Sequence, residues 1–141
     1  MSVTTNDTVS VGEERTQEFP ALTRTMFVRY AGASGDFNVI HWNERVAKSV
    51  GLPNVIAHGM LTMATAGRVV TDWAGDPGKV LSYGVRFSSP VVVEDDDQGA
   101  TLSVAGVVEE KNDDGTVVVG LTVTVGDKKV LMGAKATVRL S

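Results

Sequence analysis

Residues 59–87 read GMLTMATAGRVVTDWAGDPGKVLSYGVRF, and the hydrophobic period changes within this stretch. In residues 59–74, apolar side chains cover most of the circumference of a helix and polar ones form only a narrow stripe, which is typical of a buried helix. The glycines and proline of residues 75–78 end that helix. From Leu81 to Phe87 apolar residues alternate with polar ones, which predicts a strand with one apolar face.

The same alternation continues to the end of the chain. Turn signals at residues 112–115 and 126–127 divide it into strands. Four late strands joined by short turns predict an antiparallel meander, and helix 59–74 is the obvious cover for its apolar face. We therefore expect an α+β fold, with one curved antiparallel sheet wrapped around a long central helix.

The region before the central helix predicts smaller elements. Residues 1–11 are rich in Ser, Thr and Asn and are expected to form a flexible N-terminal arm, so that the domain covers residues 12–141. Residues 12–19 suit a polar edge strand. Two short helices are expected, at residues 23–31 and 43–50. Thr23 and Asn43 are their predicted N-caps, and Gly32 and Gly51 end them. Loops are expected at residues 32–35 and 52–57.

The composition excludes several classes of binding partner and of active site. The chain has 141 residues, a net charge of −4 and no cysteine. The negative charge argues against nucleic acid or an anionic membrane surface as the main partner. Thiolate nucleophiles and cysteine-based metal sites are excluded. We see no signal peptide and no apolar run long enough to span a membrane, so a cytoplasmic protein is expected.

Candidate chemistry lies in Asp36, Asn38 and His41, which share one Gly-rich segment. Imidazole is suited to proton transfer near neutral pH, and a nearby carboxylate can share that task. Asn38 can hold a carbonyl, a water or the loop itself. The alternative is an Asx turn beside a surface histidine, and spacing alone leaves both interpretations open.

A second candidate is the start of the central helix, at His58 and Gly59. Free N–H groups at a helix N-terminus carry partial positive charge, so the Gly59 amide could bind a developing oxyanion. Alternatively, Gly59 only permits a sharp entry into the helix, and His58 caps or packs. Asp36, His41 and His58 could in principle bind a metal, but no ligand motif supports this, and no metal is expected.

These segments resemble a known family. The pieces Tyr30-Ala31-Gly32, Ser34-Gly35-Asp36-Phe37-Asn38, Ile40-His41 and Ile56-Ala57-His58-Gly59-Met60 are similar to the hydratase-2 motif of MaoC-like (R)-specific enoyl hydratases and hydroxyacyl dehydratases. Residues 41–42, 58–63, 73–80 and 85–87 resemble the HadB-type catalytic subunits of actinobacterial (3R)-hydroxyacyl-ACP dehydratases.

The resemblance implies a hot-dog fold, a catalytic pair of Asp36 and His41, a positioning Asn38, an oxyanion amide at Gly59, and no cofactor. The implied reaction interconverts (3R)-3-hydroxyacyl-ACP or -CoA with the trans-2-enoyl thioester and water, in type II fatty-acid elongation of the mycolic-acid type. Alternatives are a stand-alone (R)-specific enoyl-CoA hydratase of fatty-acid degradation or polyester supply and, from a different class, a hot-dog thioesterase. Val39 departs from the family's usual proline.

The resemblance also implies where the substrate and a partner would lie. An acyl chain would run beside the central helix, with His58, Met60 and Met63 as candidate substrate contacts, although each could equally be ordinary core. A dimer is expected, either with a second hot-dog subunit that lacks the catalytic pair or with a second copy. Neither nucleic acid nor membrane is an expected partner.

Overall fold

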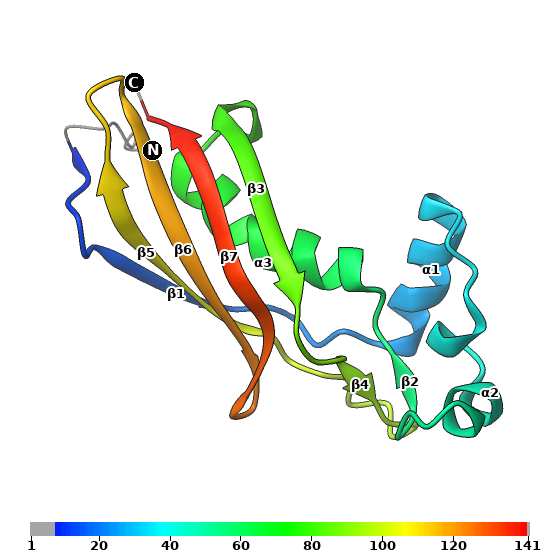
Figure 1. Cartoon of the computed structure of the whole chain (residues 1–141). Helices are drawn as coiled ribbons and strands as arrows, with labels where there is room; N and C mark the ends of the chain where they lie inside the picture. Colours follow the sequence, from blue (N-terminus) through cyan, green and yellow to red (C-terminus); the bar gives the residue numbers. More distant parts are fainter. Residues whose placement is uncertain (1–7, 141) are drawn as a thin grey trace.

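A computed structural model describes residues 8–140 of the chain, and its central element is helix α3 (Gly59–Ala74) (Figure 1). The bounds of α3 are those predicted from the hydrophobic period. Gly75 ends the helix at a φ of 74°, a left-handed conformation that glycine adopts without steric cost. None of the helices in the described residues is both long enough and apolar enough to cross a membrane.

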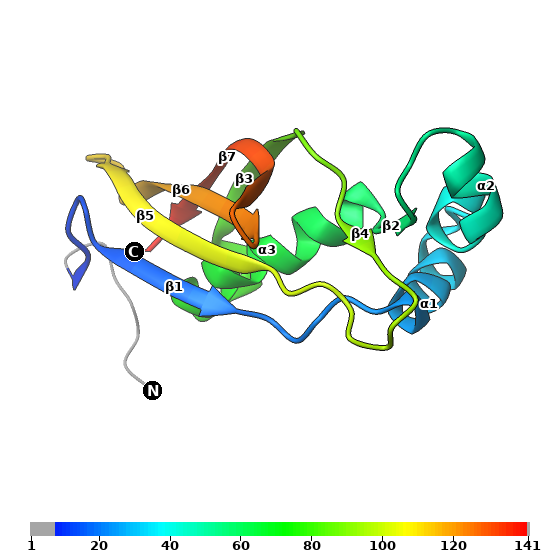
Figure 2. The same ribbon diagram turned by 90° about the horizontal axis from the view of Figure 1, so that it is seen from below.

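A five-stranded antiparallel sheet curves around α3, in the arrangement of a hot-dog fold (Figures 1 and 2). Its order is β1-β5-β6-β7-β3. The strands are β1 (Glu14–Glu18), β3 (Val80–Phe87), β5 (Ser103–Lys111), β6 (Thr116–Val125) and β7 (Lys128–Arg139). The predicted α+β class and the polar edge strand β1 are confirmed.

The predicted four-strand meander is only partly correct. Strands β5, β6 and β7 are joined by hairpins and lie side by side, as expected. Strand β3, however, pairs with β7 at the opposite end of the sheet from β1. The alternation of a strand specifies which face is buried but carries no information about its neighbour, so the order could not be read from the pattern.

The core lies between α3 and the concave face of the sheet. Val104 and Val108 of β5 and Val69 of α3 belong to it. A Cβ added at Gly106 would lie 3.3 Å from Val69 Cγ1, so this glycine allows α3 to pack closely on the sheet. The prediction that α3 is buried nearly all round is wrong at its start, where Met60 is 56% exposed.

Shorter elements surround the N-terminus of α3, at one end of the molecule (Figure 2). Helix α1 runs three residues further than predicted, because Gly35, at a φ of 78°, ends it in place of Gly32. The predicted caps Thr23 and Asn43 are confirmed. The predicted loop at 52–57 contains a strand. These elements are α1 (Arg24–Ser34), 3₁₀ helix η2 (Val39–His41), α2 (Glu44–Ser49) and β2 (Val55–Ile56), which pairs with β4 (Val92–Val93). A second 3₁₀ helix, η3 (Pro77–Lys79), follows the C-terminus of α3 and leads into β3.

Arg24 joins these short elements. Its guanidinium donates to Glu44 Oε2 at 3.1 Å, to Asn54 Oδ1 at 2.6 Å and to the Val93 carbonyl at 3.0 Å. Asn54 is buried and in turn donates to Glu94 Oε2 at 2.8 Å. Charge-assisted hydrogen bonds of this kind are stronger than neutral ones, so Arg24 fixes α1, α2, β2 and β4 relative to one another.

The N-terminal segment differs from the expected arm where it is described. Residues 1–7 of that arm lie outside the described residues. Val9 belongs to the core, and the ammonium group of Lys111 donates to its carbonyl oxygen at 2.7 Å. An apolar side chain next to the domain gains free energy by packing on it, so in the structure the domain includes Val9, before the predicted start at residue 12.

Candidate active site

The segment after α1 presents one carboxylate oxygen of Asp36. The Asp36 backbone N–H donates to Ser34 Oγ at 3.1 Å, and Asp36 Oδ1 accepts the Asn38 backbone N–H at 3.1 Å. Asn38 Oδ1 accepts the Ile40 backbone N–H at 3.3 Å and thereby caps η2. These local bonds are Asx-type turns. They occupy Oδ1 of Asp36 and leave its Oδ2 directed at the residue that follows on η2.

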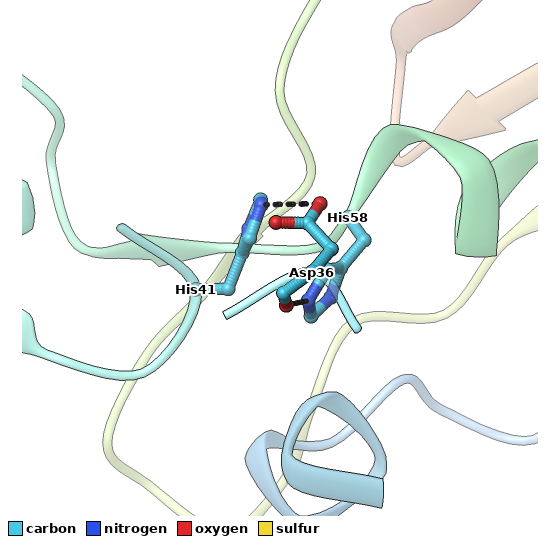
Figure 3. Close-up of side chains that lie close together, drawn as sticks. All are labelled: Asp36, His41 and His58. Atoms are coloured by element: carbon cyan, nitrogen blue, oxygen red, sulfur yellow. Dashed lines mark hydrogen bonds and ion pairs between the residues drawn. The ribbon is translucent and has the colours of Figure 1, made fainter. Parts of the chain in front are cut away.

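That residue is His41, which is buried. Its Nδ1 lies 2.7 Å from the Ile56 carbonyl oxygen. A carbonyl only accepts hydrogen bonds, so Nδ1 carries the hydrogen and Nε2 of the neutral ring is the unprotonated nitrogen. Nε2 faces Asp36 Oδ2 at 3.9 Å (Figure 3). This separation exceeds a hydrogen bond but lets one substrate or water oxygen contact both groups.

His58 lies directly beneath this pair (Figure 3). It is 1% exposed, and its ring stacks on that of His41 with centroids 3.8 Å apart and planes 25° apart. Its Nε2 contacts the Asp36 carbonyl oxygen at 3.1 Å. Burial lowers the pKa of His58 below its usual value, and the neighbouring His41 adds to this effect.

A pocket of about 310 Å³ opens beside His41 and the start of α3. Gly59 lines it at the first position of the helix, where backbone N–H groups have no intrahelical acceptor. Phe87 lies over Gly59, because a Cβ added there would be only 3.0 Å from Phe87 Cε1. The remaining lining residues are Ile56, Ala57, Thr62, Ser88, Ser89, Pro90, Val91, Val130 and Leu131. The wall is mostly apolar, and its polar groups come from His41, the backbone at Gly59 and the hydroxyl residues Thr62, Ser88 and Ser89.

The structure thus brings Asp36, Asn38, His41 and Gly59 to one place, as the sequence led us to expect. The three candidate substrate contacts are elsewhere. His58 lies below His41 and outside the lining of the pocket. Met60 is exposed, and the side chain of Met63 is likewise outside the lining, while its carbonyl accepts the Tyr83 hydroxyl at 2.9 Å. Both methionines therefore lie outside the pocket wall, and Met60 lies at the surface.

Residues 87–91, Val130 and Leu131 form a pocket wall that no sequence motif predicted. These come from the end of β3, the segment leading to β4, and the start of β7. Val130 and Leu131 are consecutive apolar residues in a strand that otherwise alternates. A break in alternation is a weak sequence signal for a strand that turns a second apolar side chain toward a cavity.

The donor atoms of Asp36, His41 and His58 all lie within 4.8 Å of one another. Two of the imidazole nitrogens already contact backbone carbonyls. The lone pair of an imidazole nitrogen lies in the ring plane, and the planes of the two stacked rings are only 25° apart with centroids separated by 3.8 Å, so their lone pairs do not converge readily on one ion. The geometry therefore disfavours a shared metal, and the absence of a metal stays a prediction.

Comparison with known proteins shows which family this chain is similar to. A family model described as "MaoC like domain" matches residues 3–127. The (R)-specific enoyl-CoA hydratase of Rhodospirillum rubrum is 36% identical over 110 residues, which cover 77% of this chain and 73% of that protein. The 3-hydroxyacyl-thioester dehydratase X of Mycobacterium tuberculosis is 40% identical over 72 residues, which cover 51% of this chain.

A solved structure of a MaoC-like dehydratase superposes with a TM-score of 0.93 and is 40% identical over 99% of this chain. The chain spans 43% of the length of that structure's chain and 25% of the length of the M. tuberculosis relative. The match to the solved structure therefore covers almost all of this chain, that to the M. tuberculosis relative about half of it, and each covers less than half of the other protein.

Proposed function

The chain belongs to the MaoC-like domain family, and on this premise we propose that it is a hydro-lyase that interconverts (3R)-3-hydroxyacyl and trans-2-enoyl thioesters. One observation carries the proposal. Asp36 Oδ2 and His41 Nε2 face each other at 3.9 Å beside a mostly apolar pocket, and the free amide of Gly59 lines the same pocket. Reversible hydration needs these three things: an acid–base pair, a site for the thioester oxygen, and room for an acyl chain.

In the dehydration direction, the Gly59 N–H binds the thioester oxygen and stabilises the enolate-like charge that develops as the C2 proton leaves. A base takes that proton, and the 3-hydroxyl receives one proton and departs as water, so the protein ends in its starting protonation state. The neutral tautomer of His41 leaves Nε2 free, which supports His41 as the group that accepts a proton. Asp36 orients the oxygen that lies between them.

The test is hydration of crotonyl-CoA, followed by loss of enoyl absorbance. We expect His41→Gln and Asp36→Asn each to lower kcat by about 10²- to 10⁴-fold while the Tm changes little. As a control for Asp36→Asn, Asp72→Asn makes the same Asp-to-Asn change on an exposed residue of α3 and should retain full activity. Near-normal hydration by His41→Gln would refute the proposed role of His41.

The same assay separates the competing class. A hot-dog thioesterase would release free thiol from acyl-CoA, whereas a hydratase would not. The Asp36–His41 arrangement supports hydration, because it positions an oxygen for attack at C3 and leaves the thioester oxygen to Gly59. Release of thiol without loss of enoyl absorbance would favour the thioesterase.

We extend the proposal to the pathway in which the protein acts and to the subunit with which it pairs. The relatives are named as an enoyl-CoA hydratase and a hydroxyacyl-thioester dehydratase, and we propose acyl-ACP or acyl-CoA of fatty-acid elongation as the substrate. The sheet ends at β3, where Leu81 and Phe87 are exposed, and an apolar edge of this kind supports a dimer. Sizing the protein alone and after co-expression with a second hot-dog subunit distinguishes a homodimer from a heterodimer. The cytoplasmic location remains a prediction.

A further inference from the structure

His58 is the one residue of the His-Gly step that the proposed reaction does not use. It is among the largest fully buried side chains of the protein. The edges of two aromatic rings pack around it, from Tyr30 at a centroid distance of 4.7 Å and from Phe27 at 6.0 Å. A polar ring enclosed in this way costs free energy unless its hydrogen bonds are satisfied, so its single hydrogen bond indicates a function for it.

The hydrogen bond fixes the protonation of His58. Its Nε2 meets the Asp36 carbonyl, which can only accept, so Nε2 carries the hydrogen. Its Nδ1 is buried and has no hydrogen-bond partner in the described part of the chain. A protonated ring would leave an Nδ1–H unsatisfied there. His58 is therefore a neutral ring with a single donor, and that donor is directed at Asp36.

We propose that His58 is a positioning residue for the Asp36–His41 pair, with its Nε2–H anchoring the main chain of Asp36 and its ring face fixing the plane of His41. The inference rests on the proposed function. Asp36 lies in an exposed segment whose other hydrogen bonds join residues two to five positions apart. The bond from His58 spans 22 positions and ties that segment to the start of α3.

The stacking contact carries the second half of the proposal. With centroids 3.8 Å apart, the His41 ring cannot tilt toward His58, and its Nδ1–H is held on the Ile56 carbonyl at 2.7 Å. The direction of Nε2 toward Asp36 follows from these two constraints. A neutral His58 also allows His41 to take up a proton without a like charge against its face.

Two substitutions separate the two contacts. His58→Phe keeps a flat ring against His41 but removes the donor to Asp36. His58→Gln keeps an amide N–H that can reach the Asp36 carbonyl but removes the ring. We expect His58→Phe to lower kcat for crotonyl-CoA by about 100-fold and His58→Gln by about tenfold, with KM within about threefold of the wild-type value in both. A folded variant of either kind with kcat within about twofold of the wild type would overturn the proposal.

Imidazole NMR supplies a readout that does not depend on activity. The chain has two histidines, and the structure assigns them opposite neutral tautomers, Nδ1–H for His41 and Nε2–H for His58. Two-bond ¹H–¹⁵N spectra of untagged protein should show both. In His58→Gln the remaining His41 loses its stacking partner, so the share of its Nδ1–H tautomer in these spectra should fall. The same tautomer in both rings, or an unchanged His41 signal in that variant, would contradict the inference even if hydration is never observed.

Discussion

Substitution of Gly59 by alanine tests the site by adding a single methyl group. The new Cβ would lie 3.0, 3.2 and 3.2 Å from three ring atoms of Phe87, whereas ordinary contacts begin near 3.4 Å. The ring must therefore retreat by about 0.4 Å, the difference between 3.4 and 3.0 Å. Phe87 is 55% exposed and can move, and alanine favours a helix over glycine by up to about 1 kcal/mol, so we expect the unfolding free energy to change by less than about 1 kcal/mol.

Activity should respond more strongly than stability. The methyl group and the displaced ring stand beside the amide that would receive the thioester oxygen. A misplacement of 1 Å can cost about 100-fold in rate, so a shift of about 0.4 Å predicts a loss of roughly tenfold in kcat/KM for crotonyl-CoA. Urea unfolding of the same preparations provides the stability measurement.

A double-mutant cycle identifies the cause of that loss. Phe87→Ala removes the ring that the new methyl group would meet, so Gly59→Ala should cost less than about threefold in this background. An equal loss in both backgrounds would show that the methyl group acts on something other than Phe87. Unchanged kcat/KM in Gly59→Ala alone would refute the placement of the thioester oxygen at this amide.

Three further predictions concern stability. Because burial lowers the pKa of His58, the unfolded chain binds one more proton in the pH range between that lowered pKa and about 6.5. The unfolding free energy should therefore fall as the pH decreases through this range, by up to about 1.4 kcal/mol per pH unit, and urea titrations should show that this part of the slope is absent in His58→Phe. Val39→Pro should raise the unfolding free energy by about 0.4–1 kcal/mol with unchanged kcat, since Val39 is the first residue of η2, where proline fits; a lower Tm would contradict this. Arg24→Met should lower the unfolding free energy by about 2–3 kcal/mol, because Asn54 loses a charged partner. A change of less than about 0.5 kcal/mol would refute the role given to Arg24.

Local features of the site could be predicted from the sequence because they depend on residues close together in the chain. Hydrogen bonds between neighbouring positions form the turns that hold Asp36, Asn38 and His41 together. Asn38 binds the loop itself, which is one of the three roles considered for it. Met60 and Met63, predicted as substrate contacts, lie outside the lining of the pocket. Helical spacing shows that a side chain lies on one face of a helix but not which face meets a pocket.

The sequence by itself determined the α+β class, the bounds of α3, the alternation of the late strands and the residues that converge at the site. Only the tertiary structure decided that β3 lies beside β7, that residues 87–91 and 130–131 wall the pocket, and that His58 is stacked under His41. The physical reason is the range of the interactions. Hydrophobic period and capping act within one element, whereas strand order, pocket walls and ring stacking depend on packing between residues far apart in the chain, which a single sequence does not encode in any local pattern.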